Sequence, residues 1–163
     1  MKTLLLLRHA KSDWSDSSLA DVDRPLNRRG RRAAARMGRL LQSESLLPDL
    51  LVSSPAVRAR KTAVRVARRC GYERAIELQP DLYHAAPGGI CRVLRSLWSD
   101  PACVLLVGHN PGLEELLERL TGQYERFPTA ALAQLALPIE SWDDLEVSSS
   151  ATLLNLWRPR QLD

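Results

Sequence analysis

The stretch Leu4-Leu5-Leu6-Leu7-Arg8-His9-Ala10 decides the fold, because four consecutive leucines run directly into an arginine and a histidine. A short apolar run bounded by polar residues is typical of a strand buried inside a sheet. In open α/β sheets, ligands bind just beyond the carboxyl ends of such strands. We therefore expect a strand over residues 3–8, with Arg8 and His9 at the edge of the sheet where a ligand binds.

A second apolar run far along the chain repeats this arrangement. Val104-Leu105-Leu106-Val107 leads into Gly108-His109-Asn110-Pro111-Gly112, so His9 and His109 each follow a predicted buried strand. Between the two strands, Ser53-Ser54-Pro55 leads into a predicted helix that carries Arg58. Two histidines and two arginines that meet at one edge of a sheet predict a site for a phosphoryl group.

The length of 163 residues predicts a single domain, residues 1–163, that is large enough for a proper core. The N-terminal run of four leucines is too short for a signal peptide or a membrane span. We find no other targeting signal and expect a cytoplasmic protein. Cys70, Cys91 and Cys103 are widely spaced and contain no CxxC pair, which favours buried free thiols over disulfides or a zinc cluster.

The net charge is +4, and the basic residues are nearly all arginine. Many of these arginines lie on two predicted helices. Stripes of this kind suit either nucleic-acid binding or a solvated helix face. We favour the solvated face, because no nucleic-acid motif and no aromatic stacking platform accompanies the charge. The arginines concerned are Arg28, Arg29, Arg31, Arg32, Arg36, Arg39, Arg60, Arg65, Arg68 and Arg69.

Predicted strands and helices alternate along the chain with short connections, which predicts an α/β layered fold with a mostly parallel sheet. We expect Ser54 to cap the second helix, Pro55 to be its first residue and Gly71 to end it. The last two strands favour an antiparallel hairpin. The expected elements are strand 3–8, loop 9–27, helix 28–42, strand 49–53, helix 55–70, strand 76–79, helix 87–98, strand 102–107, helix 112–121, strand 131–137 and strand 151–157.

Phosphoryl transfer through histidine places clear demands on a site. The nucleophile needs a neutral ring nitrogen, while a hydrogen bond to the other nitrogen fixes the tautomer. Arginines bind the phosphoryl oxygens through two parallel hydrogen bonds and stay charged. A second histidine can donate to an oxygen as charge develops. Arg8, His9, Arg58 and His109 supply this set without a metal or another cofactor.

The joint pattern resembles the histidine phosphatase superfamily, which also contains the cofactor-dependent phosphoglycerate mutases. Within it, the compact length and the segment Arg24-Pro25-Leu26-Asn27 look most like the small SixA-type phosphohistidine phosphatases. The resemblance implies a three-layer α/β/α sandwich of the phosphoglycerate mutase type. The matching stretches are Leu6–Ser12, Asp23–Gly30, Ser53–Ala63 and Val107–Gly112.

The resemblance also implies the roles of individual residues. His9 would be the nucleophile that becomes phosphorylated, Arg8 and Arg58 would clamp the phosphoryl oxygens, and His109 would stabilise the transferring group. Water would then hydrolyse the phosphohistidine. Ser12 and Asn110 fall in the matching stretches and count as substrate-binding positions. His84 is either a donor to the substrate or a hydrogen-bonding residue of its loop.

Two departures from the family pattern matter. Ala10 stands where the family has glycine, and an alanine with a positive φ would be strained. The mutase-like branches carry a glutamate acid near residues 82–85, where this chain has His84 and no acidic residue. Asp23 and Asp13 are candidate acids, as is Asp21, although Asp23 equally suits a helix cap or an arginine partner. An imidazole leaving group needs little acid assistance, which favours a phosphoramidate substrate.

These observations favour a metal-independent phosphatase that acts through phospho-His9, with a phosphohistidine-bearing protein as its partner. A small phosphomonoesterase for a metabolite or sugar phosphate is the alternative within the enzyme class. A non-catalytic module that binds phosphoprotein or nucleic acid is the alternative outside it, although such a module would not need a nucleophile. We expect no membrane partner, and a nucleic-acid partner is disfavoured.

Overall fold

The computed structural model describes residues 1–162 and places its strands in one sheet, with the order β3-β2-β4-β1-β5-β6. The four strands from β3 to β1 are parallel, whereas β5 runs antiparallel to both of its neighbours. The expected mostly parallel sheet and the C-terminal antiparallel hairpin are therefore confirmed. The strands are β1 (Lys2–Arg8), β2 (Leu50–Ser53), β3 (Glu77–Leu78), β4 (Cys103–Gly108), β5 (Leu132–Leu137) and β6 (Thr152–Trp157).

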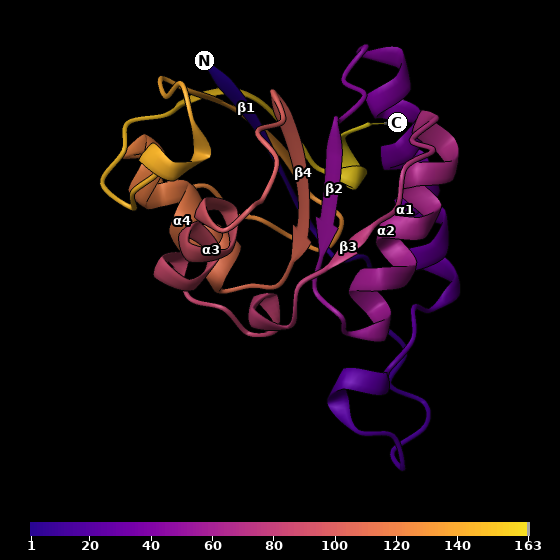
Figure 1. Cartoon of the computed structure of the whole chain (residues 1–163). Coiled ribbons are helices and arrows are strands. Elements are labelled where there is room, and N and C mark those ends of the chain that lie inside the picture. The colour runs from indigo at the N-terminus through magenta and orange to yellow at the C-terminus, as the bar shows by residue number, and fades with distance from the viewer. Residues whose placement is uncertain (163) are drawn as a thin grey trace.

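Helices cover both faces of the sheet, which makes the expected three-layer α/β/α arrangement (Figure 1). One face carries α1 (Arg28–Ser43) and α2 (Val57–Cys70), and the other carries α3 (Pro87–Arg95) and α4 (Gly112–Thr121). Short 3-10 turns lie in the connections: Asp21–Asp23, Pro80–Leu82, Trp142–Asp144 and Pro159–Gln161. No helix within residues 1–162 is both long and apolar enough to span a membrane.

The leucine run of β1 serves both layers, because successive side chains of a strand point to opposite faces. Leu5 and Leu7 pack in the cluster beneath α1 and α2, whereas Leu4 and Leu6 pack in the cluster beneath α3 and α4. All four side chains are fully buried. Burying one leucine contributes roughly 1.5–3 kcal/mol, so this strand anchors both halves of the core.

Two helix boundaries differ from the expected ones. The helix expected over 87–98 ends at Arg95, and the helix expected over 55–70 begins at Val57, with Ala56 as its cap residue. Ser54 is therefore not the N-cap, and Pro55 lies before the helix. The hydroxyl of Ser54 contacts the ring of His109 and accepts from the Ala56 amide, which keeps it in the loop. The other elements lie within one or two residues of their expected bounds, and Gly71 ends α2 with a φ of 86°.

The loop after β1 returns to the sheet edge through contacts near its end. The side-chain oxygen of Asn27 caps α1 by accepting from the Gly30 backbone amide at 2.8 Å. The backbone amide of Asn27 donates to the Lys11 carbonyl. Gly30 is needed here, because a Cβ at this position would lie 2.1 Å from that carbonyl oxygen. Ser12 and Leu26 form an isolated antiparallel bridge. These contacts join the two ends of the loop to each other beside the end of β1.

Candidate active site

The two site histidines follow the ends of neighbouring strands. Arg8 and Gly108 are paired at the ends of β1 and β4, and the His9 amide donates to the Gly108 carbonyl at 3.0 Å. His109 is the residue that follows Gly108 at the end of β4. The centroids of the two imidazole rings consequently lie 5.1 Å apart, and both side chains are buried.

His9 is held as one defined tautomer. Its Nδ1 lies 2.8 Å from the carbonyl oxygen of Ala10, and because a carbonyl only accepts, Nδ1 carries the proton. Burial lowers the pKa of His9 to about 4, helped by the positive charges of Arg58 and Arg8 and opposed by the Ala10 hydrogen bond. The imidazole is therefore neutral near pH 7, with a free lone pair on Nε2.

His109 contacts the hydroxyl of Ser54 through Nε2 at 2.7 Å. Its Nδ1 is buried and has no hydrogen-bond partner within the described residues. Burial, followed by the charges of His9 and Arg58, lowers the pKa of His109 to about 3. The Ser54 hydroxyl accepts from a backbone amide and can also donate a hydrogen bond to Nε2; with that donation, the neutral His109 ring carries its proton on Nδ1.

Arg58 comes from the first turn of α2, and the residue is 5% exposed. It donates to Asp21 twice, from Nη1 to the backbone oxygen at 2.7 Å and from Nη2 to Oδ2 at 3.0 Å. Arg8 donates from Nη1 to the carbonyl of Phe127 at 3.3 Å, while its buried Nε has no partner in residues 1–162. Both predicted clamp arginines therefore reach the edge of the sheet where the histidines lie.

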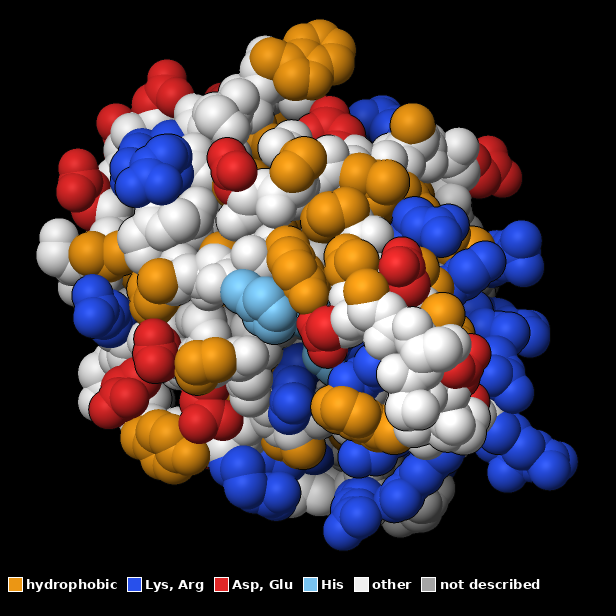
Figure 2. Space-filling model, turned by 90° about the horizontal axis from the view of Figure 1, so that it is seen from below, with side chains coloured by type: hydrophobic (Ala, Val, Ile, Leu, Met, Phe, Trp, Pro, Cys, Tyr) orange, Lys and Arg blue, Asp and Glu red, His pale blue; other side chains and the backbone are white. Residues whose placement is uncertain are grey.

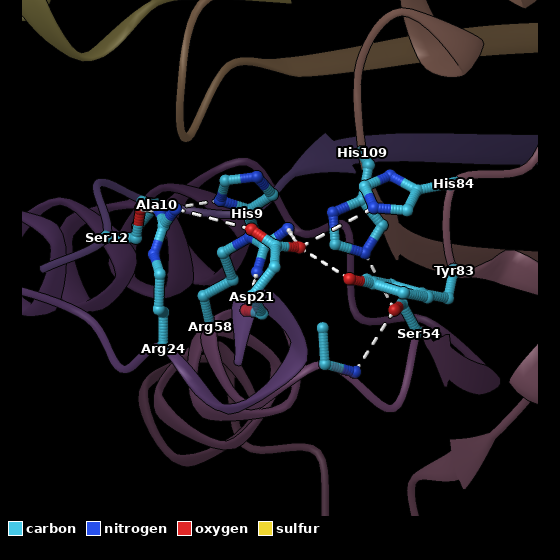
Figure 3. Close-up of polar contacts among 11 residues, drawn as sticks. His9, Ala10, Ser12, Asp21, Arg24, Ser54, Arg58, Tyr83, His84 and His109 are labelled. Atoms are coloured by element: carbon cyan, nitrogen blue, oxygen red, sulfur yellow. Dashed lines mark hydrogen bonds and ion pairs between the residues drawn. The ribbon is translucent and has the colours of Figure 1, made fainter. Parts of the chain in front are cut away.

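Asp21 is the centre of the polar network that Figure 3 shows. Besides Arg58, its carboxylate contacts Arg24 at 3.3 Å, accepts from the Tyr83 hydroxyl and lies 3.5 Å from Nε2 of His84. The Tyr83 hydrogen bond and the charges of Arg58 and Arg24 lower the pKa of Asp21 to about 2. A carboxylate of the chain thus occupies arginine donors that a phosphoryl group would also use.

Arg24 adds a third buried guanidinium to the site. It donates to the hydroxyl of Ser12, and the ring of exposed Trp14 covers it with its centroid 3.1 Å away. Its Nε is buried and has no partner within the described chain. In the sequence, Arg24 stands out only as part of the family segment Arg24–Asn27, with no predicted role at the site. Its role in the network follows from the fold of the loop, which no local pattern predicts.

His84 lies at the rim of the site, in a backbone conformation with a φ of 55°. Its ring stacks on that of Tyr83 at a centroid distance of 4.0 Å, and 57% of its side chain is exposed. This position fits both predicted roles of His84, a donor to the substrate and a hydrogen-bonding residue of its loop. Tyr83 is a site residue that the sequence did not single out, because only the fold brings its hydroxyl to Asp21.

Asn110 lies at the pocket, but its amide group is already used. Nδ2 donates to the Phe127 carbonyl at 2.8 Å, and Oδ1 accepts from the Glu114 amide at 3.2 Å. Glu114 in turn accepts from the Phe127 amide at 2.9 Å. The same carbonyl accepts from Arg8, so these contacts position Arg8 from the side of α4. The predicted contact of Asn110 with substrate stays a prediction.

A cavity of about 270 Å³ joins the residues of the site. Within the described chain, Asp21 supplies the acidic side chain of its lining, whereas the candidate acids Asp13 and Asp23 lie outside it. Asp13 is an exposed acceptor for the Ser15 amide, and Asp23 is exposed in the 3-10 turn. The turn directs Asp21 inward and Asp23 outward, so the carboxylate at the site is Asp21. The lining consists of Arg8, His9, Lys11, Ser12, Trp14, Asp21, Arg24, Arg58, His84, His109, Asn110 and Thr129.

Ala10 fits without strain in the position where the family has glycine. The non-glycine residues with a positive φ in residues 1–162 are Ser45, His84 and Ala130, so Ala10 has an ordinary backbone conformation. Its amide donates to the Thr62 hydroxyl of α2 at 3.0 Å, and its carbonyl orients His9. The backbone strain that a positive φ at Ala10 would cause is therefore absent.

Within residues 1–162, no cluster of three or more His, Cys, Asp or Glu side chains could hold a metal ion.

Comparisons with known proteins agree with this geometry. The family model of the histidine phosphatase superfamily, branch 1, matches residues 4–89. An uncharacterised chloroplast protein of Arabidopsis thaliana is 35% identical over 152 residues, which cover 88% of this chain and 70% of that protein. The chain therefore belongs to the histidine phosphatase superfamily.

Two solved structures place the fold more narrowly. A protein assigned as phosphohistidine phosphatase SixA from Agrobacterium tumefaciens is 28% identical, with a TM-score of 0.82 over 97% of this chain and 98% of that chain. A protein assigned in the same way from Nakamurella multipartitia is 27% identical, with a TM-score of 0.82 over 97% and 96%. The chain is thus SixA-like in fold, and its family and fold support a phosphatase activity.

Proposed function

We propose that this protein is a phosphohistidine phosphatase that removes the phosphoryl group from a histidine of another protein through a phospho-His9 intermediate. The observation that carries the proposal is the contact between Nδ1 of His9 and the Ala10 carbonyl. It leaves a neutral imidazole whose Nε2 lone pair is free, beside arginines that can hold a phosphoryl group. A nucleophile needs this protonation state and this orientation.

The arginines Arg8 and Arg58 bind the phosphoryl oxygens in this proposal, and Asp21 yields its hydrogen bonds with Arg58 when the dianion arrives. The unpartnered Nδ1 of His109 donates to an oxygen of the transferring group, which satisfies a buried donor that has no partner in the free enzyme. Catalysis then depends on positioning and on charge stabilisation, which are the main contributions to phosphoryl transfer.

The reaction has two balanced steps. In the first, the Nε2 lone pair of His9 forms a bond to phosphorus while the bond from phosphorus to the substrate imidazole nitrogen breaks. The substrate ring takes up a proton from solvent on its other nitrogen, so it departs as a neutral imidazole that keeps the electron pair of the broken bond. In the second, water attacks phosphorus, the bond to Nε2 breaks, and inorganic phosphate leaves as the water proton passes to solvent.

The acid–base properties of the pocket favour a nitrogen leaving group. The carboxylate at the site, Asp21, has a pKa of about 2, so it does not hold a proton that it could donate near neutral pH. An alkoxide would need such a donor, whereas an imidazole has a conjugate acid with a pKa near neutrality. This supports phosphohistidine over a phosphomonoester as the substrate.

The test compares hydrolysis of a phosphohistidine-bearing protein with that of a generic phosphomonoester, in EDTA, by the wild type and by His9→Ala. We expect faster cleavage of phosphohistidine by the wild type, no effect of the chelator, and no turnover by the variant. Acid-labile radiolabel on the wild type but not on His9→Ala would identify the intermediate. Thermal unfolding of both proteins controls for folding.

Other results would contradict the proposal in different ways. Preferred cleavage of the monoester would make the protein a small phosphomonoesterase, with Tyr83 and His84 as the donors to examine. Inhibition by the chelator would contradict the metal-free mechanism. Absence of turnover with both substrates would favour a non-catalytic binding module.

We further propose that residues 1–163 act as one histidine phosphatase domain in the cytoplasm. The three cysteines are free thiols, which suits a reducing compartment. Fractionation of the native host, followed by immunodetection, tests the location. Limited proteolysis, in which a single stable fragment is expected, tests the domain.

A further inference from the structure

An arginine-rich groove of about 770 Å³ lies beside α1 and α2, outside the pocket of the histidines. Its lining within residues 1–162 contains nine arginines, two alanines and one proline, and no acidic or aromatic residue. On α1, Arg28, Arg32, Arg36 and Arg39 are spaced by four, four and three residues, which places them along one helix face. Arg65 and Arg69, four residues apart on α2, line the same groove.

Four arginines of this groove have no acidic partner among residues 1–162. Within the described residues, the ion pairs give no acidic partner to Arg32, Arg39, Arg65 or Arg69. So many like charges on one surface repel one another, and an anionic partner relieves that repulsion. Exposed arginines that the fold does not pair are available to such a partner.

The groove is connected to the pocket of His9 by a third depression of about 370 Å³. This depression shares Arg29 and Arg160 with the groove, and it shares Lys11 and Thr129 with the pocket. Arg126 adds further positive charge to it, whereas Arg158, which also lines it, is paired with Glu125 at 3.1 Å. Figure 2 shows Lys and Arg side chains gathered along one border of the face on which the exposed histidine lies.

We propose that this basic track, the groove together with the connecting depression, binds an acidic segment of the phosphorylated protein substrate while its phosphohistidine enters the pocket. This inference rests on the proposed function. Arginine suits carboxylates, because its planar fork donates two parallel hydrogen bonds to them. The face from Arg28 to Arg39 spans twelve residues, about 16 Å along the helix axis, which matches about five residues of an extended peptide.

A nucleic acid fits the track less well than an acidic peptide. Proteins that bind single strands stack the bases on aromatic side chains, and the groove lining has none within residues 1–162. The track also ends in a pocket with two buried histidines, which a continuous phosphate backbone would not need. The pocket instead accepts one phosphoryl group from a chain that lies along the track.

The test uses synthetic phosphohistidine peptides that differ in one run of five residues, which is Glu in one peptide and Gln in the other. The run is placed on either side of the phosphohistidine, two, five or eight residues away. We expect wild-type kcat/KM to be about tenfold higher for the best Glu peptide, mostly through KM, and the preference to fall with added salt. The double variant R32E/R69E should lose the preference and hydrolyse the Gln peptide normally.

The matched control is R92E/R119E, which makes the same charge change at exposed positions of α3 and α4 on the other face of the sheet. It should keep the preference. Equal kcat/KM for both peptides, or an undiminished preference in R32E/R69E, would overturn the inference and leave the phosphatase proposal standing. Binding of a short DNA duplex more tightly than the Glu peptide, lost in R32E/R69E, would also overturn it. Failure of the wild type on every phosphohistidine peptide would instead contradict the proposed function.

Discussion

Arg58 and Asp21 form a two-point contact in which the guanidinium donates to the backbone oxygen at 2.7 Å and to Oδ2 at 3.0 Å. This geometry resembles the way in which an arginine binds two oxygens of a phosphoryl group. The protein therefore keeps Arg58, the proposed clamp arginine, in a defined position by supplying an internal anion. In the proposed mechanism, a phosphoryl group displaces that carboxylate or shares the arginine with it.

Removing the negative charge of Asp21 should strengthen the binding of phosphate-like anions. In Asp21→Asn we expect the inhibition constant of inorganic phosphate or tungstate to fall about tenfold, or about 1.4 kcal/mol, because a competing carboxylate is gone. Inhibition kinetics at fixed ionic strength measure it. Asp23→Asn is the matched control, since Asp23 lies in the same turn but outside the pocket. Unchanged or weaker inhibition in Asp21→Asn would show that Asp21 does not compete for Arg58.

Loss of the Arg58 guanidinium should weaken both phosphate binding and turnover. A charge-assisted contact of this kind contributes about 2 kcal/mol, so kcat/KM should fall about thirtyfold or more in Arg58→Ala. Arg60→Ala serves as the control, because Arg60 is two residues further along α2 and does not line the pocket. Wild-type kinetics in Arg58→Ala would mean that the phosphoryl group binds elsewhere.

The histidines should titrate at unusually acidic pH. The pKa of His9 is about 4 and that of His109 about 3, so kcat/KM should stay high down to about pH 4 and fall below it, as His9 takes up a proton. An NMR titration of the imidazole resonances checks the two values directly. An acid limb near pH 6.5 would contradict the burial of the neutral rings.

The same pKa values predict how stability depends on pH. Unfolded histidine has a pKa of about 6.5, so between about pH 6.5 and pH 4 the unfolded chain binds protons that the folded His9 does not. The free energy of unfolding should therefore fall as the pH drops through this range. Denaturant unfolding at several pH values measures the slope, which should be smaller in His9→Asn. An identical slope in both proteins would remove His9 as the cause.

Gly30 should be intolerant of a side chain. In Gly30→Ala the new Cβ would lie 2.1 Å from the Lys11 carbonyl oxygen, which forces the loop after His9 away from α1. We expect lower stability and lower kcat/KM, measured by unfolding and by kinetics. Gly88→Ala is the control, since nothing lies within 4 Å of a Cβ at position 88 of α3, and it should stabilise the protein by about 0.5 kcal/mol. Wild-type behaviour of Gly30→Ala would show that the loop adapts.

Local sequence patterns predicted the positions of the strand-end residues well. Arg8 ends β1 and His9 follows it, and His109 follows β4, because a single residue separates each histidine from the end of an apolar run. The parallel pairing of those strands then brings their ends to one edge. The antiparallel hairpin of β5 and β6 also followed from local signals, since a polar connection joins two apolar runs.

Local patterns did not predict the side-chain contacts between residues that lie far apart in the sequence. Ser54 reads as a helix cap by its neighbours, but its hydroxyl contacts His109, 55 residues away. The loop over residues 9–27 contains four aspartates, and only its folded path decides that Asp21 faces Arg58. Tyr83 reaches Asp21 across 62 residues, which no periodicity encodes.

By itself, the sequence determined the layered fold, the edge at which the site lies and the residues at the strand ends, because strand burial and strand direction follow from local hydrophobic patterns. Only the tertiary structure decided which carboxylate meets Arg58, which tautomer His9 adopts and how the arginine surface connects to the pocket. Those features depend on loops whose conformations are set by contacts between residues far apart in the chain.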